Sequence, residues 1–514
     1  MQRWTITRLI AISFALTAVT ASIGGQVARD QKAWSAVIPR TWDDQAMESL
    51  ELPLAHAAAS PRHISSEYYY RIPVRPIYKS YPVYRPDREP AGYADFLKAQ
   101  QPEIVFDSSI SKTQEDWIKA GELVFDAPIE FESSGTLFSE IKRTGWFDKN
   151  RVLTTKDGIL PNMKYVIREK GKVELGILSC AMCHSRVMPD GSVIKGAQGN
   201  FPDDRAFGYE TKIEFANAKD DKVKDKLLKD LRSFMRRSYA APWLQNDPNS
   251  QPDRMTIEEI ASVMEAIPVG VCARQGSSGF YPARIPDLIG VKDRRYLDLS
   301  GLVRHRTVGD LMRYAALNQG ADFLSSYGDF RPRGELRDPS KESRYSDEQL
   351  YALALFLYSL KPPPNPNKFD ALASRGKQVF EEQGCALCHT PPLYTNNKLT
   401  PADGFQVTDE RLKQDDVMSI SVHTDSTSTL KTRRGTGYYK VPSLKGVWYR
   451  GPFEHNGSVA TLEDWFDPLR LRDDYTPTGF LGYRVKTRAV PGHKFGLDLS
   501  LEDRKSLVAF LKTL

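Results

Sequence analysis

The chain has little of several features that mark common classes of protein. Its 514 residues carry a net charge of only +6 and contain no run of basic residues, so nothing indicates nucleic-acid binding. Four of its five cysteines stand in two C-x-x-C pairs, which leaves no disulfide framework. No loop rich in oxygen ligands has the spacing of an EF-hand calcium site. The length allows two or three domains, each with its own core.

Long apolar stretches are also absent, except near the N-terminus. Arg3 and Arg8 precede an apolar run that extends from Leu9 to about Ile23, and small residues follow at several possible cleavage positions. This order predicts a signal peptide over residues 1–28 and a periplasmic or otherwise exported protein. The run is short for a spanning helix, and an uncleaved membrane anchor is the alternative. We expect no membrane span in the mature chain.

Two short segments of identical pattern carry the chemistry: Cys180-Ala-Met-Cys183-His184 and Cys385-Ala-Leu-Cys388-His389. C-x-x-C-H is the attachment sequence of a c-type haem. Its two thiols form thioethers with the vinyl groups of the porphyrin, and the following histidine binds the iron. We therefore expect two covalently bound haem c groups, attached through the four cysteines of the pairs, with His184 and His389 as axial ligands.

Other uses of C-x-x-C pairs fit the sequence less well. A structural zinc site usually takes its ligands from pairs separated by about 12–20 residues, and these pairs are much farther apart. A thioredoxin-like redox motif needs no following histidine. The fifth cysteine, Cys272, stands among small apolar residues, so we expect a buried thiol that behaves as a small hydrophobic residue.

An internal repeat predicts the architecture. Gly121 and Gly376 lie in similar short segments, and Pro286 to Gly301 aligns without a gap on Pro442 to Gly457. Each unit ends in a predicted helix, capped by Ser346 or Ser500, with one apolar stripe that is typical of core packing: Leu353, Phe356, Leu357 and Leu360 in the first unit and Leu507, Phe510, Leu511 and Leu514 in the second.

These patterns predict a mainly α-helical protein with two cytochrome c-like haem domains and long loops. The first domain would span residues 111–362, with insertions, and the second residues 363–514. An N-terminal extension, residues 29–110, precedes them. Its segment 61–92 is rich in proline and tyrosine, which excludes a helix and predicts an extended strap that packs its tyrosines on the haem domains.

The C-terminal unit resembles a known family. The segments that carry the resemblance are Val441-Pro-Ser-Leu-Lys-Gly446, Gly451-Pro-Phe-Glu-His455-Asn-Gly457 and Gly492-His493-Lys-Phe-Gly496. They are similar to those of the dihaem cytochrome c peroxidase superfamily, which includes bacterial dihaem peroxidases, the dihaem enzyme that matures methylamine dehydrogenase, and rubber oxygenase. The resemblance covers both haem motifs and most of residues 360–514, and the Gly-His-x-x-Gly form is most similar to the rubber oxygenase branch.

The resemblance implies a division of labour between the haems. The C-terminal haem would be six-coordinate and transfer electrons, with His493 as its second axial ligand. His455 would lie near the haems without binding iron. The other haem would keep an open position that meets peroxide or oxygen. From the residues themselves, His423 is the main rival to His493 as an iron ligand, followed by Met418.

The first unit offers no obvious second ligand. Between Leu302 and Tyr345 only His305 and Met312 could serve, and both lie too early in the span to match the place of His493. The remaining residues of interest have ordinary interpretations: His56, His63 and His305 as exposed side chains, Trp243 and Trp448 as core aromatics, and Glu258, Glu259 and Glu265 as surface charges on a helix.

The leading hypothesis is an exported dihaem oxidoreductase of the peroxidase or oxygenase kind. It would exchange electrons with a small redox protein or with another electron donor or acceptor. The distal acidic segment of the peroxidases is not recognisable between Cys183 and Ser346. Two alternatives stay open. One is an electron-transfer cytochrome in which both irons are closed, and the other is a haem-based sensor that binds a ligand without turnover.

Overall fold

The computed structural model describes residues 34–245, 247–274, 276–320, 324–414 and 416–514. The predicted signal peptide, residues 1–28, lies outside these ranges. Within them, no helix is both long and apolar enough to cross a membrane.

The chain folds into helices and short strands joined by long loops. The helices, in chain order, are α2 (Asp44–Glu48), α3 (Ser66–Arg71), α4 (Tyr93–Ala99), α5 (Gln114–Asp126), α6 (Thr136–Glu140), α7 (Thr144–Asn150), α8 (Cys180–His184), α9 (Asp203–Ala216), α10 (Asp221–Tyr239), α11 (Ile257–Glu265), α12 (Val308–Asn318), α13 (Asp347–Ser359), α14 (Ala371–Glu382), α15 (Asp409–Gln414), α16 (Thr427–Leu430), α17 (Leu462–Trp465) and α18 (Leu501–Lys512).

The strands are all paired in antiparallel fashion. A four-stranded sheet contains, in spatial order, β2 (Ser80–Tyr84), β4 (Ile159–Glu169), β5 (Lys172–Ile177) and β3 (Glu130–Glu132). The two-stranded pairs are β1 (Pro61–Arg62) with β12 (Ser326–Tyr327), β6 (Ser185–Val187) with β7 (Val193–Lys195), β8 (Val271–Cys272) with β9 (Ala283–Arg284), β10 (Tyr296–Leu297) with β11 (Val303–Arg304), and β13 (Leu399–Pro401) with β14 (Tyr438–Lys440).

Two pairs of helices pack in the same way, α5 against α13 and α14 against α18. A glycine allows the close approach in each pair. A Cβ atom on Gly121 would lie 1.9 Å from the carbonyl oxygen of Ala352, and one on Gly376 would lie 1.8 Å from that of Ser506. Only a residue without a Cβ lets two backbones approach this closely. The repeat predicted from the sequence is confirmed at these helix pairs.

The closing helices of the two units begin where the sequence predicts. The hydroxyl of Ser346 accepts a hydrogen bond from the amide of Gln349, which completes a capping box at α13, and Ser500 caps α18. The apolar stripes face the core, since Leu353 and Leu507 are each only 1% exposed. Burial of these stripes joins each closing helix to the first helix of its unit.

The four-stranded sheet corrects the prediction of a mainly α-helical protein to a mixture of helices and strands. β4 and β5 form a hairpin whose turn passes through Gly171 at a φ of 82°, a left-handed conformation that favours glycine. Leu160, Tyr165 and Ile167 of β4 are buried. The hairpin lies in the insertion that separates α5 from Cys180, and this insertion has no counterpart in the second unit, so the repeat carried no information about it.

The N-terminal extension is also only partly the extended strap that its prolines predict. Helix α3 begins after Ser65, whose hydroxyl accepts a hydrogen bond from the amide of Tyr68 at 3.3 Å. The prolines of this region lie on either side of α3, where they do not interrupt it. Tyr69 is buried and stacks on Trp42, another residue of the extension, with ring centroids 4.3 Å apart. The packing of the strap on haem domains stays a prediction.

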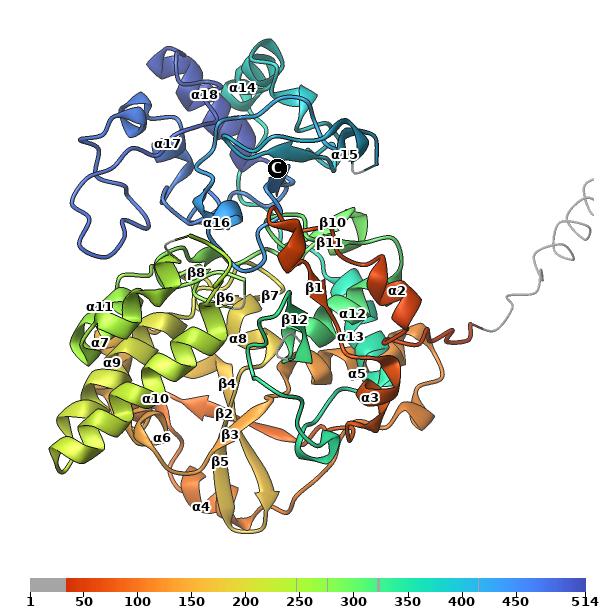
Figure 1. Cartoon of the computed structure of the whole chain (residues 1–514), viewed down its shortest axis with the longest axis vertical. Coiled ribbons are helices and arrows are strands. Elements are labelled where there is room, and N and C mark those ends of the chain that lie inside the picture. Colours follow the sequence, from red (N-terminus) through yellow and green to blue (C-terminus); the bar gives the residue numbers. More distant parts are fainter. Residues whose placement is uncertain (1–33, 246, 275, 321–323, 415) are drawn as a thin grey trace, which may run out of the picture.

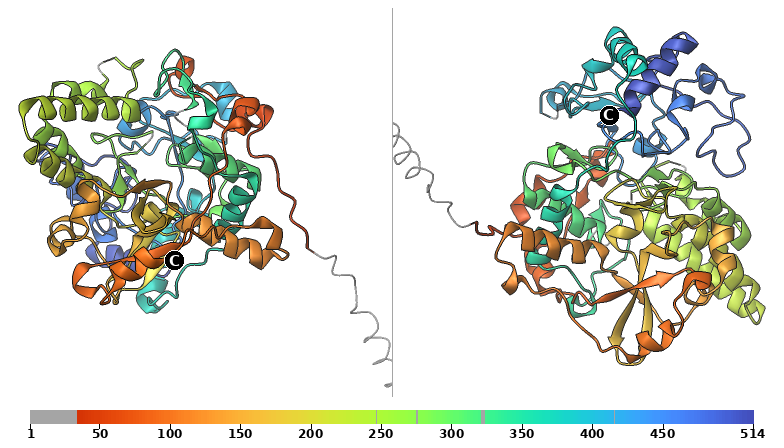
Figure 2. Two further views of the ribbon diagram at one scale, coloured as in Figure 1. Left: turned by 90° about the horizontal axis from the view of Figure 1, so that it is seen from below. Right: turned by 180° about the vertical axis from the view of Figure 1, so that it is seen from behind.

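Figure 1 shows α14, α15, α17 and α18 at the top, and the four-stranded sheet with most of the other helices below them. The view from behind in Figure 2 has the same arrangement. One hydrophobic cluster contains Val379, Phe453 and Leu507, and another contains Leu311 and Leu353. Each repeated helix pair thus belongs to a core of its own. The domain boundaries themselves stay predictions.

Candidate cofactor pockets

Helix α8 consists of the first C-x-x-C-H motif. Ser179 caps it by accepting a hydrogen bond from the amide of Met182 at 3.1 Å. Buried Asn162, on β4, donates to the carbonyl oxygen of Met182 at 3.0 Å. At the end of the helix, Nδ1 of His184 lies 3.0 Å from the carbonyl oxygen of Pro286. The sheet therefore helps to position the motif, and a loop of the repeat orients its histidine.

The second motif begins with a single turn of 3₁₀ helix, Cys385–Leu387, after Gly384 at a φ of 69°. Nδ1 of His389 lies 3.1 Å from the carbonyl oxygen of Tyr394. Burial lowers the pKa of both motif histidines, His184 and His389, to about 4, so both rings are neutral near pH 7. A neutral imidazole whose Nδ1 donates to a carbonyl presents Nε2 as a metal ligand.

Each motif lines a pocket of its own. The C-terminal pocket is lined by residues that include Cys385, Cys388, His389, Trp465 and His493. The N-terminal pocket is lined by residues that include Cys180, Cys183, His184, Arg274 and Tyr314. Because the two cysteine pairs face different pockets, they are not arranged as the four ligands of one zinc ion.

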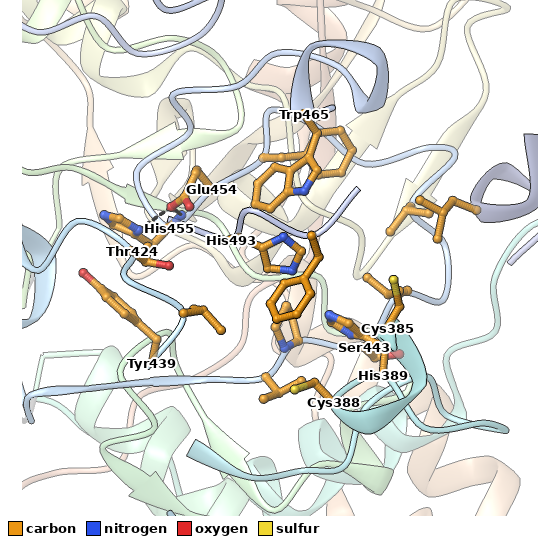
Figure 3. Close-up of a pocket in the computed structure, with 18 of the residues that line it drawn as sticks. Cys385, Cys388, His389, Thr424, Tyr439, Ser443, Glu454, His455, Trp465 and His493 are labelled. Carbon is orange, nitrogen blue, oxygen red and sulfur yellow. Dashed lines mark hydrogen bonds and ion pairs between the residues drawn. The ribbon is translucent and has the colours of Figure 1, made fainter. Parts of the chain in front are cut away.

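The C-terminal pocket brings two histidines, His389 and His493, close to each other (Figure 3). The ring centroids of His389 and His493 lie 6.3 Å apart, with an angle of 54° between the rings. Two metal–imidazole bonds of about 2 Å each, added to the distance from each nitrogen to the centre of its ring, account for a separation of this size. The residues of this pocket therefore fit a haem whose iron lies between the two rings.

Backbone hydrogen bonds hold His493 in this position. Its amide donates to the carbonyl oxygen of Val422 at 2.7 Å. Buried Arg470 donates to the carbonyl oxygens of Gly492 at 3.0 Å and His493 at 2.9 Å. Nδ1 of His493 is buried and has no hydrogen-bond partner among the described residues. Burial lowers the pKa of His493, so its ring is neutral near pH 7 and suited to bind a metal.

The rival ligands lie elsewhere. The side chain of His423 is 68% exposed, and its Nδ1 lies 2.8 Å from a carboxylate oxygen of Asp403. The sulfur of Met418 lies 3.9 Å from that of Cys388. Neither is among the residues that line the C-terminal pocket. Of the three candidates, the fold brings His493 to His389.

A second buried histidine forms one wall of the same pocket. His455 stacks on Tyr439 with ring centroids 4.6 Å apart, and its Nδ1 contacts the carboxylate of Glu454. Burial alone would raise the pKa of Glu454, but the charge and hydrogen bonds of His455 outweigh burial and lower it to about 2. His455 thus lies close to the proposed haem with Nδ1 directed at a carboxylate.

The N-terminal pocket differs in its potential ligands. Among the described residues that line it, His184 is the only histidine, and there is no methionine. Arg274 donates to the sulfur of Cys183 at 3.6 Å. Cys272 also lines this pocket, where burial raises the pKa of its thiol. Cys272 is half-buried and faces a pocket, which corrects the prediction of a buried thiol that packs as a small hydrophobic residue.

Four residues line both pockets and form a shared wall: Arg284, Leu299, Tyr439 and Lys440. The sequence interpretation missed all four. The repeat contained a signal for two of them, because Arg284 stands two residues before Pro286 just as Lys440 stands two residues before Pro442. The ungapped alignment that begins at the prolines extends upstream to these cations.

Two histidines expected at the surface are buried, which corrects those predictions. His305 is 8% exposed, and its ring nitrogens lie 2.8 Å from the carbonyl oxygen of Arg294 and 2.6 Å from the hydroxyl of Tyr358. The side chain of His63 is likewise 8% exposed, with Nε2 3.2 Å from a carboxylate oxygen of Glu51. The arginines beside His305 and the place of His63 in the N-terminal extension suggested exposure, but distant parts of the chain supply polar partners that make burial possible.

The two tryptophans pack at the edges of hydrophobic clusters, and the glutamates of α11 are at least partly exposed. Trp243 stacks on Tyr327 with centroids 5.9 Å apart, and Trp448 lies edge-on to Tyr449 at 5.1 Å, so both are packing residues. On α11, Glu258 is exposed, Glu259 pairs with Arg484 at 2.7 Å and Glu265 pairs with Lys212 at 2.5 Å. His56 is exposed, and Met312 is fully buried in the core.

Comparisons with known proteins agree with this picture at a coarse level. No family model matches the chain. It is 26% identical over 162 residues to the cytochrome-c peroxidase IdrP1 of Denitromonas iodatirespirans, a match that covers 28% of this chain and 40% of that protein. The chain thus matches about two-fifths of the relative's length. This similarity points to the dihaem cytochrome c peroxidase superfamily without distinguishing its branches.

Two solved structures show weak likeness. One is the hydrazine synthase of Kuenenia stuttgartiensis, with 16% identity, a TM-score of 0.27, and coverage of 56% of this chain and 87% of that one. The other is a MauG-like protein associated with microbial copper homeostasis, with 15% identity, a TM-score of 0.28, and coverage of 58% and 90%. TM-scores this low do not establish a shared fold.

Proposed function

We propose that the chain is an exported dihaem c-type cytochrome that acts as a peroxidase- or oxygenase-like oxidoreductase. One haem would be attached through Cys180 and Cys183, with His184 on its iron. The other would be attached through Cys385 and Cys388, with His389 on its iron. A bound haem supplies an iron that exchanges electrons and, where a position is open, binds a small ligand. The similarity to a cytochrome-c peroxidase supports this class of activity.

One observation carries the division of roles, namely the different number of histidines in the two pockets. The C-terminal pocket holds His389 and His493 at a separation that suits one iron, so its haem would be closed and transfer electrons. Among the described residues of the N-terminal pocket, His184 has no second histidine or methionine to face it. Its haem would keep an open position, where peroxide or oxygen would bind.

The residues of the chain would then prepare the two sites differently. Carbonyl oxygens would hold Nδ1 of His184 and His389 so that Nε2 faces the iron in both pockets. Trp465 and Phe495, which contact the ring of His493 at centroid distances of 5.2 and 5.4 Å, would keep water from the closed haem. A small redox protein or another electron donor would reduce the C-terminal haem. The predicted signal peptide supports export to the periplasm.

An electron-transfer cytochrome is the second candidate, and it is favoured by Tyr314 and Lys440 in the N-terminal pocket. Burial lowers the pKa of Lys440 to about 7, so a neutral amine is accessible as a ligand. If either side chain bound the iron of the first haem, both irons would be closed and no substrate would bind.

Carbon monoxide decides between the two candidates. Added to the fully reduced protein, it should change the optical spectrum of one haem and leave the other unchanged. The responding haem should be absent from the Cys180→Ser/Cys183→Ser variant and present in the Cys385→Ser/Cys388→Ser variant. If neither haem of the native protein responds, the electron-transfer function holds and the oxidoreductase proposal fails.

A further inference from the structure

The wall between the two pockets carries more positive charge than its own carboxylates balance. Arg284 and Lys440 line both pockets, Arg294 lines the N-terminal pocket and Arg450 lines the C-terminal pocket. We call these four residues the cation quartet. Arg450 lies 3.8 Å from a carboxylate oxygen of Asp287. The other three form no ion pair with the described residues.

The repeat makes the quartet symmetric. Arg284 and Lys440 stand two residues before Pro286 and Pro442, and Arg294 and Arg450 stand eight residues after those same prolines. Each unit therefore contributes one cation to the shared wall and one to its own pocket. This symmetry indicates that both pockets place the same kind of negative charge at corresponding positions.

Burial penalises the charge of three members of the quartet, Arg284, Lys440 and Arg294. Burial lowers the pKa of Arg284 to about 10 and that of Lys440 to about 7, and it also lowers the pKa of Arg294. Nε of Arg284 and Nε of Arg450 are buried without a hydrogen-bond partner among the described residues. Unpaired buried cations cost stability unless an anion compensates them.

Local carboxylates offset only part of this penalty. Asp287 favours the charged forms of Arg284 and Arg294, and Asp298 favours that of Lys440, yet burial still lowers the pKa of all three cations. Burial raises the pKa of Asp298, whose oxygen accepts from the amide of Leu302 at 3.1 Å and from the hydroxyl of Ser300 at 3.2 Å. Glu454 is engaged with His455. The missing anions must therefore come from what the pockets hold.

We infer that the cation quartet binds the propionate carboxylates of both haems, with Arg284 and Lys440 shared between the two cofactors. This inference rests on the proposed function. It places the propionate edges of both haems at the shared wall and the thioether edges at the two motifs. A cation shared in this way stabilises the reduced state of both irons, since each gains an electron close to the same positive charge. The two haems are thereby coupled electrostatically.

Reduction potentials of the holoprotein, followed optically haem by haem, test the sharing. Lys440→Gln and Arg284→Gln should each lower both potentials. Arg294→Gln should lower that of the N-terminal haem alone, and Arg450→Gln that of the C-terminal haem alone. Lys440→Arg should keep both potentials near the native values. The matched control is Lys445→Gln, which removes an equal charge from an exposed position and should change neither.

Several results would overturn the inference. Two bound haems with both potentials unchanged in Lys440→Gln and Arg284→Gln contradict it, as does a shift confined to one haem. If inorganic phosphate perturbs the native haem spectra and Lys440→Gln abolishes the effect, a free anion occupies the quartet instead. Should the variants not fold, a crystal structure of the native holoprotein decides, because propionates directed at solvent exclude the assignment. Absence of haem from the native protein would contradict the proposed function itself.

Discussion

The two pockets start from the same motif and the same repeat, yet they offer an iron different second ligands. The C-terminal pocket has His493 across from His389, held by Arg470. The N-terminal pocket has leucines, Tyr314 and Cys272 around His184. On the proposed function, the repeat preserves how a haem would be attached, whereas segments outside the motifs give the two irons different second ligands.

A single aligned position sharpens the contrast. Glu454 and Asp298 occupy the same place in the repeat, twelve residues after Pro442 and Pro286 respectively. The residue after Glu454 is His455, which lowers the pKa of that carboxyl to about 2. The residue after Asp298 is leucine, and burial there raises the pKa of the carboxyl. One neighbouring side chain decides whether a buried carboxylate is stabilised as an anion.

Loss of attachment is the largest effect we predict. Cys385→Ser/Cys388→Ser should remove one of two covalent haems, and Cys180→Ser/Cys183→Ser should remove the other, because each pair faces a different pocket. Mass spectrometry of the acid-denatured protein counts the haem masses. Cys272→Ser is the control and should keep both. Zinc in place of haem in the native protein would contradict the assignment of both pockets.

Removal of His493 should leave each pocket with a single histidine ligand for its iron. His493→Ala is expected to convert the C-terminal haem from low spin to high spin, because an imidazole is a strong-field ligand that this variant lacks. Low-temperature electron paramagnetic resonance of the ferric protein measures the change. The control His423→Ala should keep the low-spin signal. A low-spin signal that survives in His493→Ala would move the ligand to another residue.

The helix pairs should respond equally if the repeat is equivalent in both units. Gly121→Ala and Gly376→Ala each force a Cβ against a carbonyl oxygen, so each should lower the free energy of unfolding by about 3 kcal/mol or more. Gly145→Ala is the matched control, because a Cβ there meets nothing within 4 Å. Denaturant unfolding measures all three. A large loss in one unit only would show that the two helix pairs are not equivalent.

The smallest predicted effect is a difference in pH dependence: Glu454 and Asp298 should change the stability of the protein in opposite directions as the pH falls. The pKa of Glu454 is lowered from 4.5 to about 2 on folding, so its ion pair contributes stability above pH 4.5 that is lost as the pH falls towards 2. Glu454→Gln should therefore cost about 3 kcal/mol near pH 7, and the cost should shrink in acid.

Asp298 should show the opposite trend. Its raised pKa means that its neutral form contributes stability below about pH 3.8 that is lost as the pH rises. The free energy of unfolding of the Asp298→Asn variant should therefore rise relative to that of the native protein as the pH increases. Denaturant midpoints between pH 3 and pH 7 test both variants, and parallel trends would contradict the assigned environments.

Local sequence patterns predicted much of the architecture. The capped closing helices begin at Ser346 and Ser500 where the sequence predicts, because caps and apolar spacing depend on residue type over a few positions. The repeat paired Gly121 with Gly376, and the structure shows that both lie at helix crossings. The hairpin of β4 and β5 was missed, since it lies in an insertion without a counterpart in the other unit. Helix α3 was missed because prolines outside it dominated the interpretation.

The residues of the candidate site also fall into two groups, those predicted from the sequence and those that only the fold brings together. The sequence alone predicted the attachment residues, since C-x-x-C-H places two thiols and an imidazole within five positions. The resemblance named His493, but the fold is what places that ring 6.3 Å from His389. The burial of His63 and His305 and the shared wall of Arg284 and Lys440 depend on contacts between distant segments. Only tertiary structure decides such contacts, because burial and charge balance are properties of the assembled chain and not of its local order.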